Sequence, residues 1–177
     1  MHPEKYRWDQ CARSFKLPAI GLLSVIVTGC AVQAPAPVDD RSVAEQVRAP
    51  AAEAARGLQV YPLRNPAVAE LTEAAAAAEH DGDLERATIL LERALRIEPR
   101  DPELLQHMAE IQLERGAWEQ AESYAARSFD VGPRVGELCQ RNWRTIALAR
   151  ERQGRNDPAR RARERIEQCQ VEAPERF

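Results

Sequence analysis

Residues 66–99 read PAVAELTEAAAAAEHDGDLERATILLERALRIEP, and residues 100–133 read RDPELLQHMAEIQLERGAWEQAESYAARSFDVGP. Aligned without a gap, the two stretches carry glycine, proline, small and apolar residues at matching offsets. The matched pairs are Leu71 with Leu105, Ala75 with Ala109, Gly82 with Gly116, Ala87 with Ala121, and Pro99 with Pro133. A fixed period of this length predicts helical hairpins that stack on one another, because each hairpin alone cannot bury its apolar stripe.

Caps and turns indicate where the helices begin and end. Asn65 precedes Pro66 and Asp101 precedes Pro102, so a side-chain oxygen can cap the exposed amides while the proline lacks an N–H that would stay unpaired. We expect helices over residues 66–80, 84–97, 102–115 and 118–129, with glycine in the turn of each hairpin. A third, less regular hairpin is expected over residues 134–153 and 158–168.

The repeated pattern resembles the tetratricopeptide repeat, in which a large apolar residue, three small residues, a turn glycine and a closing proline hold fixed positions. The first unit supplies Leu71, Ala75, Gly82, Ala87, Ala94 and Pro99, and the second supplies Leu105, Ala109, Gly116, Ala121, Ser128 and Pro133. The units depart from the family at Ala78, Leu91, Gln112 and Ala125. The resemblance implies an all-α fold, a short solenoid of about three antiparallel hairpins over residues 66–170. The alternative is a generic bundle of helical hairpins.

Two cysteines flank the third hairpin. Cys139 and Cys169 are equidistant from residue 154, where the turn is expected, and such residues stand side by side in an antiparallel hairpin. In an oxidising compartment we expect a disulfide, which in the chain-entropy model contributes roughly 3–4 kcal/mol for a loop of about 30 residues. The alternative is a pair of reduced, buried cysteines.

The first 30 residues have the pattern of an export signal. Its basic residues are Lys5, Arg7, Arg13 and Lys16. An apolar run over residues 17–28 follows, which is too short for a permanent membrane span but typical of a signal-peptide core. The run ends in Val-Thr-Gly-Cys at residues 27–30, which resembles the bacterial lipobox and implies that Cys30 is lipidated, with palmitate among its acyl chains. Ala31, where an aspartate would imply inner-membrane retention, implies the outer membrane. The alternative is a secretory signal with an incidental cysteine.

Residues 30–65 are expected to be the lipidated amino terminus and a flexible tether, between the signal peptide, 1–29, and the helical domain, 66–170. The prolines that interrupt it are Pro35, Pro37, Pro50 and Pro62. Apolar residues are too dilute for a core, and any short helix near residues 41–56 is expected to be split by Pro50. Fully extended, residues 31–65 would reach roughly 120 Å. The tail, 171–177, is expected to fray.

Tetratricopeptide repeats bind peptides along the inner face of the first helix of each hairpin, so the resemblance implies a partner-binding groove here. The corresponding positions are Thr72, Glu79, Gln106, Glu110, Glu114, Gln140 and Arg144. Because three of them are glutamates, a basic or extended partner fits the groove better than a carboxylate does. The alternative is a solvated face.

The last helix is basic. Its arginines include Arg160, Arg161 and Arg163. This basic cap predicts contact with an acidic partner or with cell-wall carboxylates, and the alternative is a solvated capping helix whose own glutamates are the partners.

No enzyme signature is present: we find no nucleophile elbow, phosphate loop or metal-ligand spacing, and expect no cofactor or metal. A net charge of −3 is too small to indicate a nucleic-acid partner. Lipobox, proline-bearing tether and repeats together resemble the outer-membrane lipoprotein activators of class A penicillin-binding proteins. This resemblance implies a lipid-anchored adaptor that faces the periplasm and activates a peptidoglycan synthase. The alternatives are a pilotin-like lipoprotein for secretin or pilus assembly, and a structural scaffold of the cell envelope.

Overall fold

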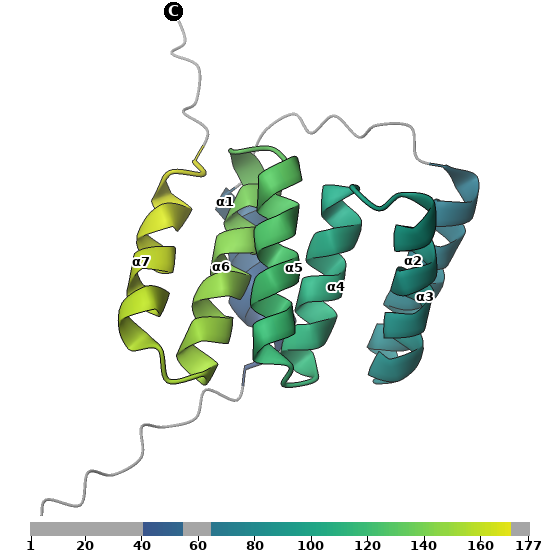
Figure 1. The fold of residues 1–177 in the computed structure, drawn as a ribbon, viewed down its shortest axis with the longest axis horizontal. Helices are drawn as coiled ribbons and strands as arrows, with labels where there is room; N and C mark the ends of the chain where they lie inside the picture. Colours follow the sequence, from purple (N-terminus) through teal and green to yellow (C-terminus); the bar gives the residue numbers. More distant parts are fainter. Residues whose placement is uncertain (1–40, 55–64, 171–177) are drawn as a thin grey trace, which may run out of the picture. The chain divides into compact units, whose positions relative to one another are not determined.

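The computed structural model describes residues 41–54 and 65–170 of the chain. All regular elements in these two ranges are helices (Figure 1). In chain order they are η1 (Ala44–Arg48), α1 (Ala49–Ala54), α2 (Pro66–His80), α3 (Leu84–Ile97), α4 (Pro102–Glu114), α5 (Trp118–Val131), α6 (Gly136–Arg152) and α7 (Asn156–Glu167). The predicted signal peptide, Cys30 and the predicted tail lie outside the described residues.

Six of these helices form three antiparallel hairpins that stack in sequence. The paired helices are α2 with α3, α4 with α5, and α6 with α7, while α3 contacts α4 and α5 contacts α6 between hairpins. The all-α fold and the short solenoid of helical hairpins predicted from the 34-residue period are therefore confirmed.

The expected caps and turns explain where the first two hairpins begin and bend. The Asn65 side chain accepts a hydrogen bond from the amide of Ala67 at 3.0 Å, and Asp101 accepts one from the amide of Glu103 at 2.8 Å. Gly82 and Gly116 have positive φ, 77° and 76°, which glycine adopts without steric cost. The two hairpins thus turn with the same geometry.

Small residues set the distance between hairpins. The largest buried cluster joins α2, α3 and α4 and consists of Val68, Ala75, Ala78, Ala87, Leu91, Ala94, Leu104, Met108 and Ile111. Alanines let neighbouring helices approach closely, while leucine, isoleucine and methionine fill the space between them. Both of the first unit's departures from the family pattern, Ala78 and Leu91, lie in this core.

A disulfide joins Cys139 of α6 to Cys169, which follows α7. Their Cα atoms are 5.6 Å apart, as expected for residues equidistant from the turn. Within α7 itself the buried residues are Ala159 and Ala162, so little apolar area holds this helix against α6. The covalent link therefore closes the carboxyl-terminal end of the solenoid, where the last helix buries only small side chains.

Part of the predicted tether folds against the repeats. Residues 44–54, hereafter the amino-terminal helix, comprise η1 and α1 and contact α6. The expectation that Pro50 splits this segment is wrong, because η1 is a π-helical turn in which the Ala49 amide bonds to the carbonyl of Ala44. The wider turn just before the proline lets the helix continue. The other parts of the predicted tether, 30–40 and 55–64, lie outside the described residues.

Candidate protein-binding groove

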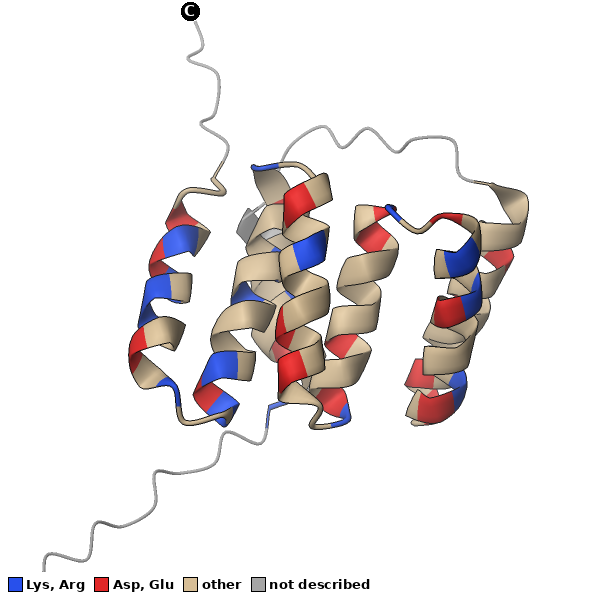
Figure 2. Cartoon of the chain, viewed as in Figure 1, with Lys and Arg blue, Asp and Glu red and all other residues tan. Residues whose placement is uncertain are grey.

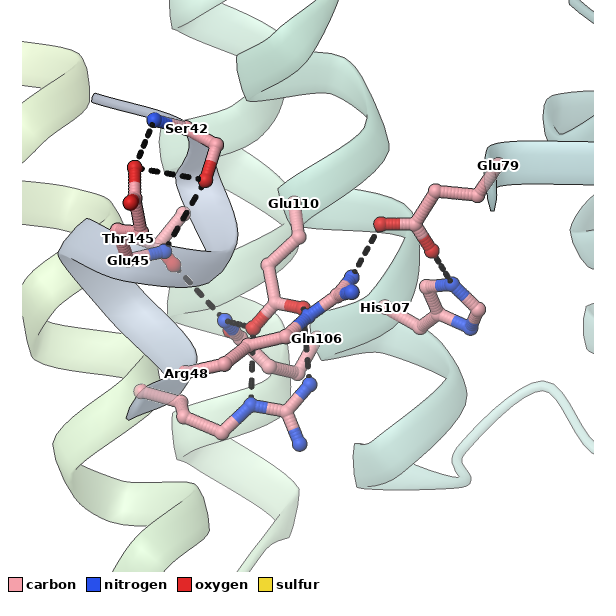
Figure 3. Close-up of polar contacts among 9 residues, drawn as sticks. Ser42, Glu45, Arg48, Glu79, Gln106, His107, Glu110 and Thr145 are labelled. Atoms are coloured by element: carbon pink, nitrogen blue, oxygen red, sulfur yellow. Dashed lines mark hydrogen bonds and ion pairs between the residues drawn. The ribbon is translucent and has the colours of Figure 1, made fainter. Parts of the chain in front are cut away.

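The predicted groove lies where α2, α4 and α6 present polar side chains to one another. Glu79 comes from α2, Gln106 and Glu110 from α4, and Thr145 from α6. The amino-terminal helix adds Arg48 to the same group (Figure 3).

Glu110 is the centre of this polar group, with no exposed surface. Arg141 donates two hydrogen bonds to its carboxylate, from Nε to Oε1 at 2.9 Å and from a terminal nitrogen to Oε2 at 2.8 Å. Arg48 Nε donates to Oε2 at 2.6 Å, and Gln106 Nε2 donates to Oε1 at 2.8 Å. A carboxylate has about four lone-pair sites, so the hydrogen-bonding capacity of Glu110 is filled.

A second carboxylate extends the group toward α2. Glu79 Oε1 lies 2.7 Å from a terminal nitrogen of Arg48, and Glu79 Oε2 lies 2.8 Å from Nε2 of His107. On the other side, Gln106 Nε2 also donates to the Thr145 hydroxyl at 2.8 Å. One continuous network therefore joins all three inner helices through Arg48 and α4.

Pairing in this network outweighs the effect of burial. Burial alone would raise the pKa of Glu110, but Arg141, Arg48 and Gln106 hold that pKa below its ordinary value. Burial also acts to raise the pKa of Glu79, and the His107 hydrogen bond and Arg48 lower it overall. Glu114 differs, because partial loss of solvent around its carboxylate and the neighbouring Glu79 raise its pKa. Glu79 and Glu110 are therefore charged carboxylates, and each pairs with the guanidinium of Arg48.

The amino-terminal helix covers part of the groove with apolar side chains. Val43 and Val47 pack into a cluster with Leu113, Ala121 and Ala149, which come from three different helices of the repeats. Val47 is fully buried, and the indole of Trp118 and the side chain of Leu148 border the cluster. The chain thus places its own segment where the resemblance predicts a bound peptide.

An open hollow of about 200 Å³ remains beside this segment. Its lining residues are Arg48, Thr72, Ala76, Glu79, Glu103, His107 and Arg141. Thr72 and Ala76 lie on α2, so the amino-terminal helix leaves the α2 side of the groove unfilled.

The structure gathers four of the seven predicted groove residues: Thr72, Glu79, Gln106 and Glu110. Glu114 lies one turn beyond Glu110 and is exposed. On α6, the polar contacts with α4 come from Arg141 and Thr145, each one position after the predicted Gln140 and Arg144. Gln140 is buried and Arg144 half-buried, and their part in binding stays a prediction.

Sequence reasoning missed Arg48, Arg141, Thr145 and His107. For Arg48 a signal existed, because Ser42 and Glu45 form the S-x-x-E pattern that starts helices. The structure shows this capping box: the Ser42 amide donates to Glu45 Oε2 at 2.9 Å, and the Glu45 amide donates to the Ser42 hydroxyl at 3.3 Å.

The basic cap has acidic partners within the chain. Arg160 pairs with Asp157 at 2.9 Å, Arg163 contacts Glu151, and Arg161 is exposed. Figure 2 shows acidic and basic residues interleaved along α7. These contacts favour the solvated capping helix over a dedicated binding surface for an acidic partner.

Other functional classes have little support in the residues described. Within the two described ranges, no three or more His, Cys, Asp or Glu side chains cluster in a way that could hold a metal ion. The helices of the same ranges are too short or too polar to cross a membrane.

Comparisons with known proteins agree with this geometry. The model of the tetratricopeptide repeat matches residues 78–133. The solved globular C-terminal domain of P. aeruginosa LpoP is 34% identical to this chain with a TM-score of 0.56, and the match covers 59% of this chain and 99% of that domain. No curated protein matches. The repeat fold and the resemblance inferred from the sequence are confirmed, and both point to a non-catalytic adaptor that binds another protein.

Proposed function

The chain belongs to the LpoP family of tetratricopeptide-repeat proteins, and on that basis we propose that it activates a class A penicillin-binding protein from the outer membrane. The lipid on Cys30 anchors the chain, and the repeats face the periplasm. The observation that carries the proposal is the 34% identity to the LpoP domain along 99% of its length.

Sequence features outside the repeats support the same assignment. The lipobox ending at Cys30 supplies an anchor, because several acyl chains bind a bilayer stably where one is marginal. The proline-bearing segment between the anchor and the repeats supplies reach toward a synthase in the inner membrane. A pilotin escorting a secretin within the outer membrane has no need of that reach.

The groove supplies a means of activation. Arg48 pairs with both Glu79 of α2 and Glu110 of α4, and a helical or extended segment of the synthase with a basic side chain would complement these carboxylates in its place. Binding shifts the synthase toward its active state only if the adaptor has a higher affinity for that state. The adaptor therefore needs no catalytic group of its own.

Affinity capture tests this proposal. The full chain is purified in detergent, immobilised, and exposed to detergent-solubilised cell envelope, and retained proteins are identified by mass spectrometry. We expect a class A penicillin-binding protein among them. Retention of a secretin or pilus subunit without any synthase would contradict the proposal and favour the pilotin.

Two variants of the immobilised chain test whether the groove makes the contact. Ala76→Arg places a bulky cation in the hollow of the groove, and Ala77→Arg is its control. Both alanines are exposed on α2, and only Ala76 lines the hollow. We expect the Ala76→Arg bait to lose the synthase and the Ala77→Arg bait to retain it.

A further inference from the structure

The groove already holds a ligand, which is a segment of the same chain. In the amino-terminal helix and the residue before it, Val43, Val47 and Ala51 are buried at a spacing of four residues. This spacing places all three on one helical face, and that face meets the repeats. The side chains at Ala44 and Ala49 are exposed, so the segment is an amphipathic helix lying in a helix-binding groove.

Arg48 makes the ion pairs between the amino-terminal helix and the groove. Arg48 contacts Glu110 at 2.6 Å and Glu79 at 2.7 Å, with two nitrogens of the same guanidinium. Without Arg48, the described network keeps the carboxylates of Glu79 and Glu110 and the guanidinium of Arg141, and the exposed carboxylate of Glu114 lies one turn away. The vacant groove would therefore be acidic and would favour a cationic occupant.

The amino-terminal helix is a weak occupant. A helix of 11 residues is marginal in water by itself. Among its described side chains, two valines and one alanine are buried against the groove, beside the ion pairs of Arg48. It contains a proline next to a π-helical turn. It also leaves the hollow bordered by Thr72 and Ala76 unfilled. A longer helix that also covered α2 would gain contacts that this segment does not make.

We propose that the groove is a receptor for an amphipathic helix with a small apolar stripe and one arginine. The amino-terminal helix is its intramolecular ligand, and a helix of the same chemistry in the partner protein displaces it. The identity of the partner rests on the proposed function, whereas the chemistry of the groove rests on the contacts described here. Displacement opens the groove and frees residues 44–54 to lengthen the connection to the anchor.

The experiment uses a fluorescent peptide of residues 41–54, RSVAEQVRAPAAEA, and the full chain in detergent. In the Val47→Asp/Arg48→Glu chain, the intramolecular helix carries acidic side chains where it meets the groove and cannot dock. The control chain carries Ala44→Asp and Ala49→Glu and keeps Glu45. Its added acidic side chains lie on the exposed face of the helix, so docking persists. Fluorescence anisotropy measures the affinity of each chain for the peptide.

We expect the Val47→Asp/Arg48→Glu chain to bind the peptide at least about tenfold more tightly than the wild type, since a tethered ligand competes at an effective concentration on the order of millimolar. The control chain should bind as weakly as the wild type. A peptide with Arg48→Glu should lose binding to every chain. In the wild type, excess peptide should speed amide hydrogen exchange at residues 44–52, a readout that needs no variant.

Equal affinity of the wild type and the Val47→Asp/Arg48→Glu chain would overturn the proposal, as would tight binding of the Arg48→Glu peptide. The result is separable from the proposed function. If the peptide binds as expected and no synthase is captured, the groove is a helix receptor for a different partner. If a synthase is captured and the peptide does not bind, activation uses another surface.

Discussion

Among single residues, Glu110 contributes most to the groove. Its carboxylate is fully buried and accepts hydrogen bonds from Arg141, Arg48 and Gln106. Removing a charge from water costs several kcal/mol, and only complete pairing offsets that cost. Loss of this one carboxylate leaves two guanidinium groups without their shared partner.

Replacement of Glu110 should therefore destabilise the whole domain. We expect Glu110→Gln to lower the free energy of unfolding by about 3–5 kcal/mol, the usual effect of removing one partner from a buried ion pair. Urea denaturation followed by circular dichroism measures it. Glu114→Gln, at an exposed position one turn away, is the matched control and should change stability by less than about 0.5 kcal/mol. Similar losses in both variants would show that Glu110 has no special structural role.

The same carboxylate predicts a pH dependence. Because the pKa of Glu110 is lower in the folded protein than its ordinary 4.5, its contribution to stability is complete above pH 4.5 and is lost as the pH falls through the folded-state pKa. The stability difference between wild type and Glu110→Gln should therefore shrink between pH 7 and pH 3. A difference that stays constant over this range would mean that Glu110 has the same pKa in the folded and unfolded states.

Residue positions within the groove were predictable only to within one residue. Of the residues placed on the inner face by the 34-residue period, Glu79, Gln106 and Glu110 share one polar network and Thr72 lines the hollow beside it. On α6, however, the contacts come from Arg141 and Thr145, because one residue corresponds to about 100° of rotation around a helix. The third hairpin departs from the repeat pattern, so the 34-residue period does not fix which residues of α6 face α4.

At the scale of elements, the three hairpins were predictable and the docking of the amino-terminal helix was not. Glycine, proline and small residues recur in register in the hairpins, so local and global signals agree there. The amino-terminal helix has a capping box at Ser42 and a short apolar stripe, but nothing in its sequence indicates the surface it packs against. Its prolines and scarce apolar residues are equally typical of a tether.

Loss of the capping box should loosen this helix alone. We expect Ser42→Ala to cost about 1 kcal/mol of local stability, which corresponds to roughly fivefold faster amide hydrogen exchange at residues 44–52. Ser42→Thr keeps the hydroxyl and should exchange like the wild type. Exchange in α2 to α7 should not change. If Ser42→Ala leaves exchange at residues 44–52 unaltered, the cap does not stabilise the docked helix.

At the scale of the whole molecule, docking of the amino-terminal helix would set how far the repeats can extend from the proposed lipid anchor at Cys30. With the helix docked, residues 31–41 connect the anchor to the folded part, and fully extended they span roughly 40 Å. With the helix released, residues 31–64 connect them and span roughly 110–120 Å. Displacement of the helix by a partner would therefore nearly triple the greatest distance at which the repeats can work.

A shortened chain tests this reach in cells. Deletion of residues 31–40 should abolish activation of the synthase in cells while leaving binding to the purified synthase intact. Adding Val47→Asp/Arg48→Glu should restore activity, because release of the helix returns more chain than the deletion removes. Full activity of the deleted chain would contradict a function that depends on crossing the cell wall, and would favour a pilotin.

The most direct test of the central claim is the rate at which a purified class A penicillin-binding protein polymerises glycan chains, measured with and without the full chain in detergent. We predict that the wild type and Ala77→Arg raise this rate and that Ala76→Arg, which blocks the groove, does not. A polymerisation rate unchanged by the wild type would contradict the proposed activation.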